Sequence, residues 1–196
     1  MYPAGKKVLI HTARYADRVM LTGWRGDCIL EKYNSAAVVC MPAHDLTVGT
    51  VTQQIESESV LLNKPYKVST IANRREIGAN ALNGSDNGKW CTACDSGIHW
   101  LEVDAEEVVK VGKWFVMHSG IHESPTWNTK SFKLEYKVNE ADEWKVADAL
   151  TDNSASMTYR SFEPVEGRYF RLYIDQSSQN PKDTTTRIYM FEVYKA

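Results

Sequence analysis

Apolar and polar side chains alternate along several short segments of the chain. In residues 130–138, every second side chain from Phe132 onward is apolar, and the side chains between them are Lys, Glu and Lys. The segments 168–175 and 187–194 also carry aromatic or aliphatic residues at every second position. An alternation with a period of two residues predicts an antiparallel strand with one face buried.

Shorter runs of the same kind predict further strands at residues 100–104, 113–117, 144–147 and 157–162. The segments between strands are rich in Gly, Ser, Asn, Asp and Pro, as in residues 80–88, 119–129 and 176–186. No segment shows a sustained helical period. Many short strands separated by such loops predict an all-β sandwich.

Residues 1–56 differ from the rest of the chain. They contain strand-like runs at 7–11, 18–21, 36–41 and 47–53, but only one of the six tryptophans, Trp24. The polar stretch 56–59 predicts a boundary near residue 56. We therefore expect a β-rich extension over 1–56 and a β-sandwich domain over 57–196. The first part can be a mini-domain, additional strands of the sandwich, or the tail of an upstream domain.

The composition is that of a globular protein without a large excess of charge. The 196 residues include 23 Lys and Arg against 25 Asp and Glu, which gives a formal net charge of −2. Affinity for nucleic acid rests on clustered Lys and Arg, so this balance argues against a nucleic-acid partner. The chain has no apolar run of the ~20 residues that a membrane span needs, and its first residues lack the apolar stretch of a signal peptide.

The cysteines and carboxylates do not form a pattern typical of an enzyme. Cys91 and Cys94 make one C-x-x-C, whereas Cys28 and Cys40 lie far upstream. A zinc site needs four ligands, so we expect buried thiols or one loop disulfide. No hydrolase, metalloprotease or phosphate-loop motif is present, and the carboxylates of 102–107 are not spaced as a glycosidase pair. We expect no catalytic activity from this chain.

Residues 25–27 spell Arg-Gly-Asp, the tripeptide that integrins bind. The tripeptide functions only on an exposed loop. We expect a buried or strand-bound setting here, and therefore a chance occurrence.

Five segments after residue 57 carry, in order, the motifs of one known family. They are the loop 81–84 with Trp90, the strand 100–104, the segment 127–136 with Trp144, and the closing strands 168–172 and 187–194. Together they resemble the discoidin family, or coagulation factor 5/8 type C domain, whose bacterial members include the family 32 carbohydrate-binding modules. The His-x-Gly at 118–120 is similar to modules appended to bacterial glycosidases. The resemblance implies an eight-stranded jelly-roll β-sandwich of the galactose-binding-domain type.

The resemblance also implies a structural Ca²⁺, held by a loop and by a glutamate near the C-terminus. The matching oxygen donors are the carbonyls of Ala81 and Gly88 and the side chains of Asn83, Asp86 and Glu192. Such a mixture of carbonyls and carboxylates suits a hard cation. Two departures from the family pattern weaken the site, because Asn stands at 83 where Asp is usual and Gly stands at 88 where Thr is usual. The alternative is a metal-free turn in which Asn83 caps its own backbone.

The family binds its ligands on loops at one end of the sandwich, and the loop 118–129 corresponds to one of them. A sugar site needs an apolar platform for the C–H face of the ring and planar polar groups for the hydroxyls. The predicted sugar-binding residues are Arg74, His118, His122, Glu123, Trp127, Asn128 and Gln179. The alternatives are a packing role for Trp127 and a structural role for His118. We expect Arg187 to hold the sheet together.

These patterns favour a non-catalytic carbohydrate-binding module, an accessory domain of a bacterial glycosidase at the cell surface or outside the cell. The resemblance implies terminal galactose, N-acetylgalactosamine or N-acetylglucosamine as ligands. The alternative is a protein-interaction or adhesion module, which is favoured if residues 1–56 cover the loop end. Binding of phosphatidylserine membranes ranks last, because the candidate loops lack exposed apolar tips.

Overall fold

The computed structural model describes residues 2–12, 15–16, 18–32, 36–95 and 97–196. It divides the chain into two compact units, residues 1–57 and 58–196.

The first unit contains two three-stranded antiparallel sheets. One sheet has the order β1 (Lys7–His11), β5 (Ala36–Cys40), β4 (Ile29–Lys32), and the other has the order β2 (Tyr15–Ala16), β3 (Val19–Gly26), β6 (Val48–Gln54). Trp24, Val39 and Ile55 are among its buried side chains. The strand-like runs predicted from the sequence correspond to β1, β3, β5 and β6.

The Arg-Gly-Asp tripeptide lies at the end of β3. Arg25 and Gly26 are its last two residues and pair with β6, and Asp27 follows in a turn. Gly26 has φ +130°, and a Cβ there would lie 2.6 Å from the carbonyl oxygen of Thr47, so this position requires glycine. The first two residues are strand-bound, as expected, but all three are exposed rather than buried.

The second unit is built on one continuous antiparallel sheet that forms both layers of a sandwich. Its strands are β7 (Tyr66–Val68), β8 (Trp90–Cys91), β9 (His99–His118), β10 (Ser131–Lys137), β11 (Lys145–Leu150), β12 (Met157–Gln176) and β13 (Arg187–Lys195). The order is β11-β10-β12-β9-β13-β8, and β7 pairs with β9. Three short 3₁₀ turns lie between strands: η1 (Gly78–Leu82), η2 (Ser119–Ile121) and η3 (Pro125–Trp127).

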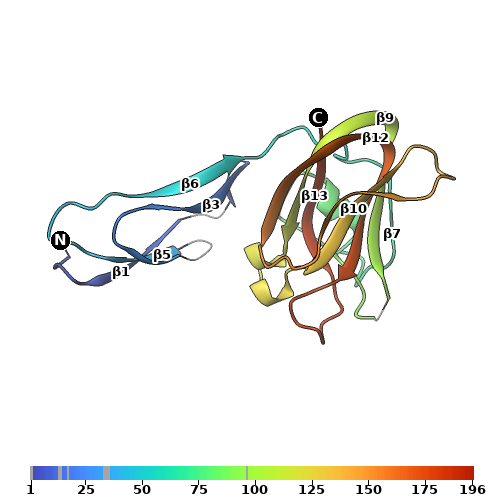
Figure 1. The fold of residues 1–196 in the computed structure, drawn as a ribbon. Coiled ribbons are helices and arrows are strands. Elements are labelled where there is room, and N and C mark those ends of the chain that lie inside the picture. The colour runs from blue at the N-terminus through green and yellow to red at the C-terminus, as the bar shows by residue number, and fades with distance from the viewer. Residues whose placement is uncertain (1, 13–14, 17, 33–35, 96) are drawn as a thin grey trace. The chain divides into compact units, whose positions relative to one another are not determined.

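Strands β9 and β12 each run through both layers and bend between them (Figure 1). Residues 99–104 of β9 lie between β12 and β7, whereas residues 113–117 lie between β12 and β13. At the bend, Glu106 has φ +68°. The sequence predicted two short strands in each of these regions, and the structure corrects them to one strand of 20 residues each.

The core between the layers is aromatic and aliphatic. Trp90, Trp114, Phe132, Phe170 and Phe191 belong to this cluster and are almost completely buried. Each large apolar side chain removed from water contributes about 1.5–3 kcal/mol. The inward positions of β10 and β12 are those that the alternation predicted, so the all-β jelly-roll sandwich is confirmed.

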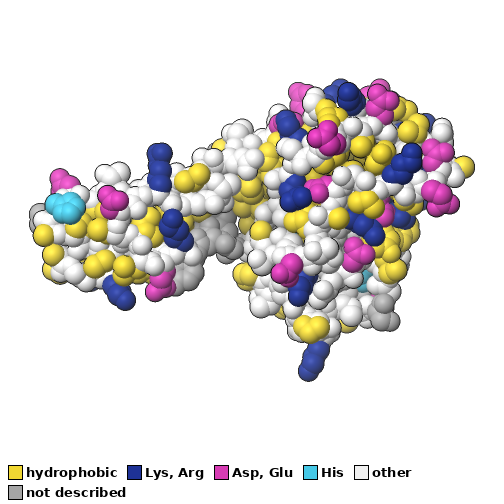
Figure 2. All heavy atoms as spheres, in the orientation of Figure 1, with side chains coloured by type: hydrophobic (Ala, Val, Ile, Leu, Met, Phe, Trp, Pro, Cys, Tyr) yellow, Lys and Arg dark blue, Asp and Glu magenta, His cyan; other side chains and the backbone are white. Residues whose placement is uncertain are grey.

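The loops 119–130 and 176–186 lie at the end of the sandwich opposite the bend of β9 and β12 (Figure 1). We call this the loop end. Basic and acidic side chains are interspersed over the face of the molecule in Figure 2, without a large patch of one sign. Among the described residues, no helix is long and apolar enough to cross a membrane.

Candidate functional site at the loop end

Gln179 fastens the loop 176–186 onto the loop 119–130. Its backbone N–H donates to the carbonyl of Thr126 (3.1 Å), and its side-chain Nε2 donates to the carbonyls of Asn128 (3.0 Å) and Asn153 (2.6 Å). An amide nitrogen has two hydrogens, so both are used within the protein. Gln179, predicted to bind sugar, thus joins two loops in this structure.

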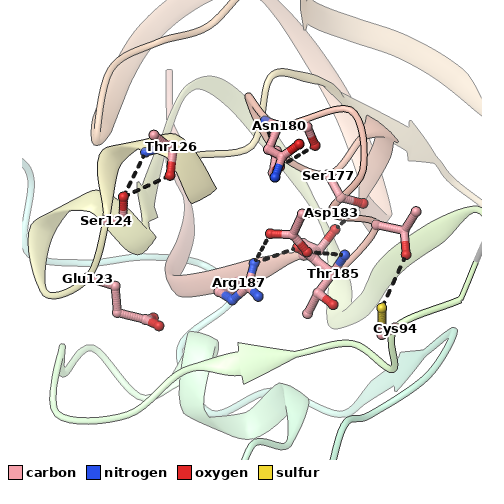
Figure 3. A network of polar contacts seen from close by, with 12 residues as sticks. Cys94, Glu123, Ser124, Thr126, Ser177, Asn180, Asp183, Thr185 and Arg187 are labelled. Atoms are coloured by element: carbon pink, nitrogen blue, oxygen red, sulfur yellow. Dashed lines mark hydrogen bonds and ion pairs between the residues drawn. The ribbon is translucent and has the colours of Figure 1, made fainter.

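Trp127 ends η3 and is half buried. The guanidinium of Arg187, at the start of β13, lies 4.7 Å from the centroid of its ring, which is a cation–π contact. Arg187 Nη1 also donates to Asp183 Oδ2 (2.7 Å) and to the carbonyl of Thr185 (3.1 Å), as Figure 3 shows. The side chain expected to hold the sheet therefore links Trp127 to the loop 176–186.

Glu123 is the centre of a second group of polar contacts. Its Oε1 accepts hydrogen bonds from Lys89 Nζ (2.9 Å) and from the hydroxyl of Tyr189 (2.9 Å). Lys89 Nζ also lies 3.2 Å from Glu76 Oε1. Burial, followed by the hydrogen bond to Glu123, raises the pKa of Tyr189 to about 12. Burial alone would lower the pKa of Lys89, but the two carboxylates outweigh it, so that pKa is raised.

His122 and Asp86 were predicted for different sites, a sugar site and a metal site. The structure brings them together, with His122 Nε2 3.0 Å from Asp86 Oδ2. The ring of His122 also lies 4.8 Å from the ring of Tyr189. This contact joins the loop 119–130 to the loop that follows η1.

His118 and Asn128 do not reach the surface. Both are 0% exposed. The ring of His118 packs 4.9 Å from that of Phe132, and its burial lowers its pKa to about 3. Asn128 accepts a hydrogen bond from the N–H of Gly120 (2.7 Å) and donates to Ser156 Oγ (3.2 Å). Neither side chain offers a surface to a sugar, so both support the loops from within.

Arg74 is exposed in the turn 73–76. Asn73 Nδ2 donates to Glu76 Oε2 (2.7 Å) across this turn. Because Glu76 also contacts Lys89, the turn that carries Arg74 is joined to the loop end. A role for Arg74 in sugar binding stays a prediction.

The three predicted calcium donors that are side chains contact protein groups. Asn83 Oδ1 accepts from the N–H of Ser85 (2.9 Å), Asp86 contacts His122, and the buried carboxylate of Glu192 accepts from the hydroxyl of Tyr194 (2.6 Å). Within the described ranges, no three His, Cys, Asp or Glu residues come together as a metal site. The predicted set also includes two carbonyls and the amide of Asn83, and calcium stays a prediction.

The loop end thus combines one half-exposed tryptophan with several hydrogen-bonding groups. The carboxylates of Asp86, Glu123 and Asp183 each have a basic partner within 3.0 Å. An aromatic face beside polar groups suits the binding of a small amphipathic molecule. The loop end is therefore the candidate site.

The F5/8 type C domain family matches residues 62–189 of this chain. Among solved structures, the chain is similar to the family 32 carbohydrate-binding module of Streptococcus pneumoniae EndoD, with 23% identity and a TM-score of 0.62 over 71% of this chain and 100% of that one. Among curated proteins, none matches the chain.

Two further similar structures were solved with sugars. Chitosan-binding module 2 of a Paenibacillus sp. IK-5 chitosanase/glucanase, in complex with chitotriose, is 15% identical, with a TM-score of 0.59 over 69% of this chain and 98% of that one. A Clostridium perfringens module in complex with GalNAc-β-1,3-galactose is 9% identical, with a TM-score of 0.57 over 67% and 95%. At these identities the likeness shows a shared fold. Since the family match spans well over half of the chain and the sandwich agrees with it, the chain belongs to the F5/8 type C domain family.

Proposed function

We propose that the second unit is a non-catalytic carbohydrate-binding module whose loop end binds a terminal sugar of the galactose, N-acetylgalactosamine or N-acetylglucosamine type. The partly exposed ring of Trp127, which contacts Arg187 and lies in the same loop as His122 and Glu123, supports this assignment above all. The C–H face of a sugar would pack on the indole, and the polar groups of the rim would meet its hydroxyls.

Such a module acts by attaching the protein that carries it to a glycan. A shallow site gains little beyond its desolvation cost, so a single sugar binds weakly. Joined to a catalytic domain, the module raises the effective concentration of that domain on a glycan surface. We propose a bacterial glycosidase, secreted or displayed on the cell surface, as the parent enzyme. The solved modules of EndoD and of the chitosanase/glucanase support this context.

A glycan array on the intact chain tests the proposal. The array is run with calcium and repeated with a chelator. Selective binding to one class of terminal sugar is the expected result, and a blank array with folded protein would contradict it. Loss of binding under chelation would support a structural cation in the loop 81–88. Retained binding would show that the contacts of Asn83 and Asp86 hold that loop without a metal.

A further inference from the structure

The ammonium group of Lys89 lies between two carboxylates at the loop end. Its Nζ is 3.2 Å from Glu76 Oε1 and 2.9 Å from Glu123 Oε1. The ring of Tyr189 lies 5.8 Å from the same nitrogen. Two carboxylates and an aromatic face are the groups that bind an ammonium ion. We call these three residues the ammonium cage.

The backbone around Lys89 holds its side chain in this cage. Lys89 precedes β8, and the pairing of β8 with the start of β13 brings it next to Tyr189. The carbonyl of Lys89 accepts a hydrogen bond from Asn80 Nδ2 (2.9 Å), and the N–H of Cys91 donates to the carbonyl of Glu76 (3.1 Å). The side chain of Lys89 is only 17% exposed. The cage is therefore a fixed part of the domain.

The other carboxylates of the loop end are also paired within the protein. Asp183 contacts Arg187 (2.7 Å), and Asp86 contacts His122 (3.0 Å). A positively charged sugar would have to displace one of these partners and lose part of its hydration. A neutral sugar, whose nitrogen is acetylated or absent, carries no positive charge and meets no such cost.

We propose that Lys89 determines specificity by occupying the ammonium cage itself, so that the loop end accepts uncharged sugars and excludes amino sugars with a free ammonium group. The proposal rests on the proposed function. It distinguishes this chain from the chitosan-binding modules that share its fold.

Matched sugars test the proposal on the intact chain at neutral pH. The pairs are glucosamine with N-acetylglucosamine, and galactosamine with N-acetylgalactosamine, with galactose as a further uncharged ligand. Calorimetric titration of the wild type is expected to detect at least one uncharged sugar and neither amine. If an amine binds as tightly as its acetylated partner, the proposal is wrong while the proposed function stands. If no sugar binds at all, the proposed function fails, and the proposal with it.

Three variants assign the selectivity to Lys89. Lys89→Met keeps an apolar side chain but removes the ammonium group, so the cage is open. Affinity for the amines is then expected to rise about tenfold or more, because that factor corresponds to one charge-assisted hydrogen bond. This gain should weaken with salt and disappear in Lys89→Met/Glu123→Gln. Lys89→Arg keeps the charge and should keep the exclusion. Lys64→Met, which removes the partner of Glu106 beside the bend of β9, is the matched control.

Melting curves establish that each variant is folded. Unchanged selectivity in folded Lys89→Met would overturn the role of Lys89. If Lys89→Met does not fold, the amine affinity of Lys89→Arg is compared with that of the wild type. A guanidinium that fills the cage must exclude amines as well as the ammonium group does. An Arg variant that gains amine binding would also overturn the proposal.

Discussion

Two regions of the F5/8 type C domain place cations against aromatic rings, and they differ in how many cations are described against each ring. On the outer face of the sheet, Tyr173 lies 4.2 Å from Lys133 and 5.1 Å from Arg171. Trp144 on the same face has two cations at 4.3 and 4.6 Å, from Arg171 and Lys137. At the loop end, the contact described for Trp127 is a single one, with Arg187.

We expect the contacts on the sheet to serve stability and the contact at the loop end to serve the proposed sugar site. On the sheet, cations and rings alternate along paired strands, and the carboxylate of Glu135 neutralises Arg171 from within the same face. The rings there contribute to the stability of the sheet. At the loop end, Arg187 lies against the ring of Trp127, which is partly exposed like Trp144 and Tyr173. What sets Trp127 apart is its place in the loops of the proposed sugar site.

Replacing each tryptophan tests this distinction most strongly. Trp127→Ala is expected to abolish sugar binding with a small change in melting temperature, because the ring is the proposed platform and has one described cation contact. Trp144→Ala is expected to preserve binding and to lower the melting temperature, because two cations lose their ring. Titration and thermal melts measure both. Binding retained by Trp127→Ala would remove this residue from the site.

Breaking the ion pair on the sheet face should cost the domain stability. Glu135 is 8% exposed at its side chain and contacts Arg171. In Arg171→Met this carboxylate loses its partner, so the free energy of unfolding is expected to fall by about 3 kcal/mol. Urea denaturation measures the loss, and sugar affinity should not change. A stability equal to that of the wild type would show that Lys133, 3.7 Å away, suffices as a partner.

Acid should weaken the domain through the buried histidine beneath the loop end. The pKa of His118 is about 3 in the folded protein and about 6.5 in an unfolded chain, so the unfolded state binds an extra proton between these values. This contribution to stability is present above pH ~6.5 and falls by about 1.4 kcal/mol per pH unit below it. Urea midpoints between pH 7 and pH 5 measure the slope.

The control for this slope is a second histidine. In His118→Leu the dependence should flatten, whereas in His122→Gln, at the surface, it should persist. An unchanged slope in folded His118→Leu would assign the acid sensitivity to other groups.

The smallest expected effect concerns Arg187, whose guanidinium lies against the ring of Trp127. Arg187→Met removes the cation from behind Trp127 and leaves Asp183 without that partner. A cation–π contact at a partly exposed site is worth about 1 kcal/mol, so the sugar affinity should fall several-fold without being lost. Titration measures it, with Arg171→Met as the matched control. If Arg187→Met binds as tightly as the wild type, Trp127 is held by its own turn.

The sandwich could be predicted because its strands alternate visibly. The inward faces of β10 and β12 follow directly from residues such as Phe132 and Phe170. The length of β9 could not be predicted, because the run from Glu106 to Lys110 at the bend interrupts the apolar pattern. There the pairing of β9 with β12 shifts in register, and the alternation of apolar and polar residues does not reveal such a shift.

The candidate site was predicted only in part, because most of its contacts join loops that are distant in the sequence. The aromatic and polar composition of the loop 119–130 pointed to Trp127 and Glu123. Nothing local distinguishes His118 or Asn128 as buried, since His118 immediately precedes this loop and Asn128 lies within it. Lys89 carries one weak signal, a charge immediately before a fully buried tryptophan, and its partners Glu76 and Glu123 are 13 and 34 positions away.

The two long strands also determine how the domain comes apart. Because the backbones of β9 and β12 are shared by both layers, neither layer can lose its order while the other keeps its own. Opening at one end must pass along the same strands to the other, so the domain unfolds as one cooperative unit. In hydrogen exchange, amides in the two halves of β9 should therefore be protected by the same free energy, that of global unfolding.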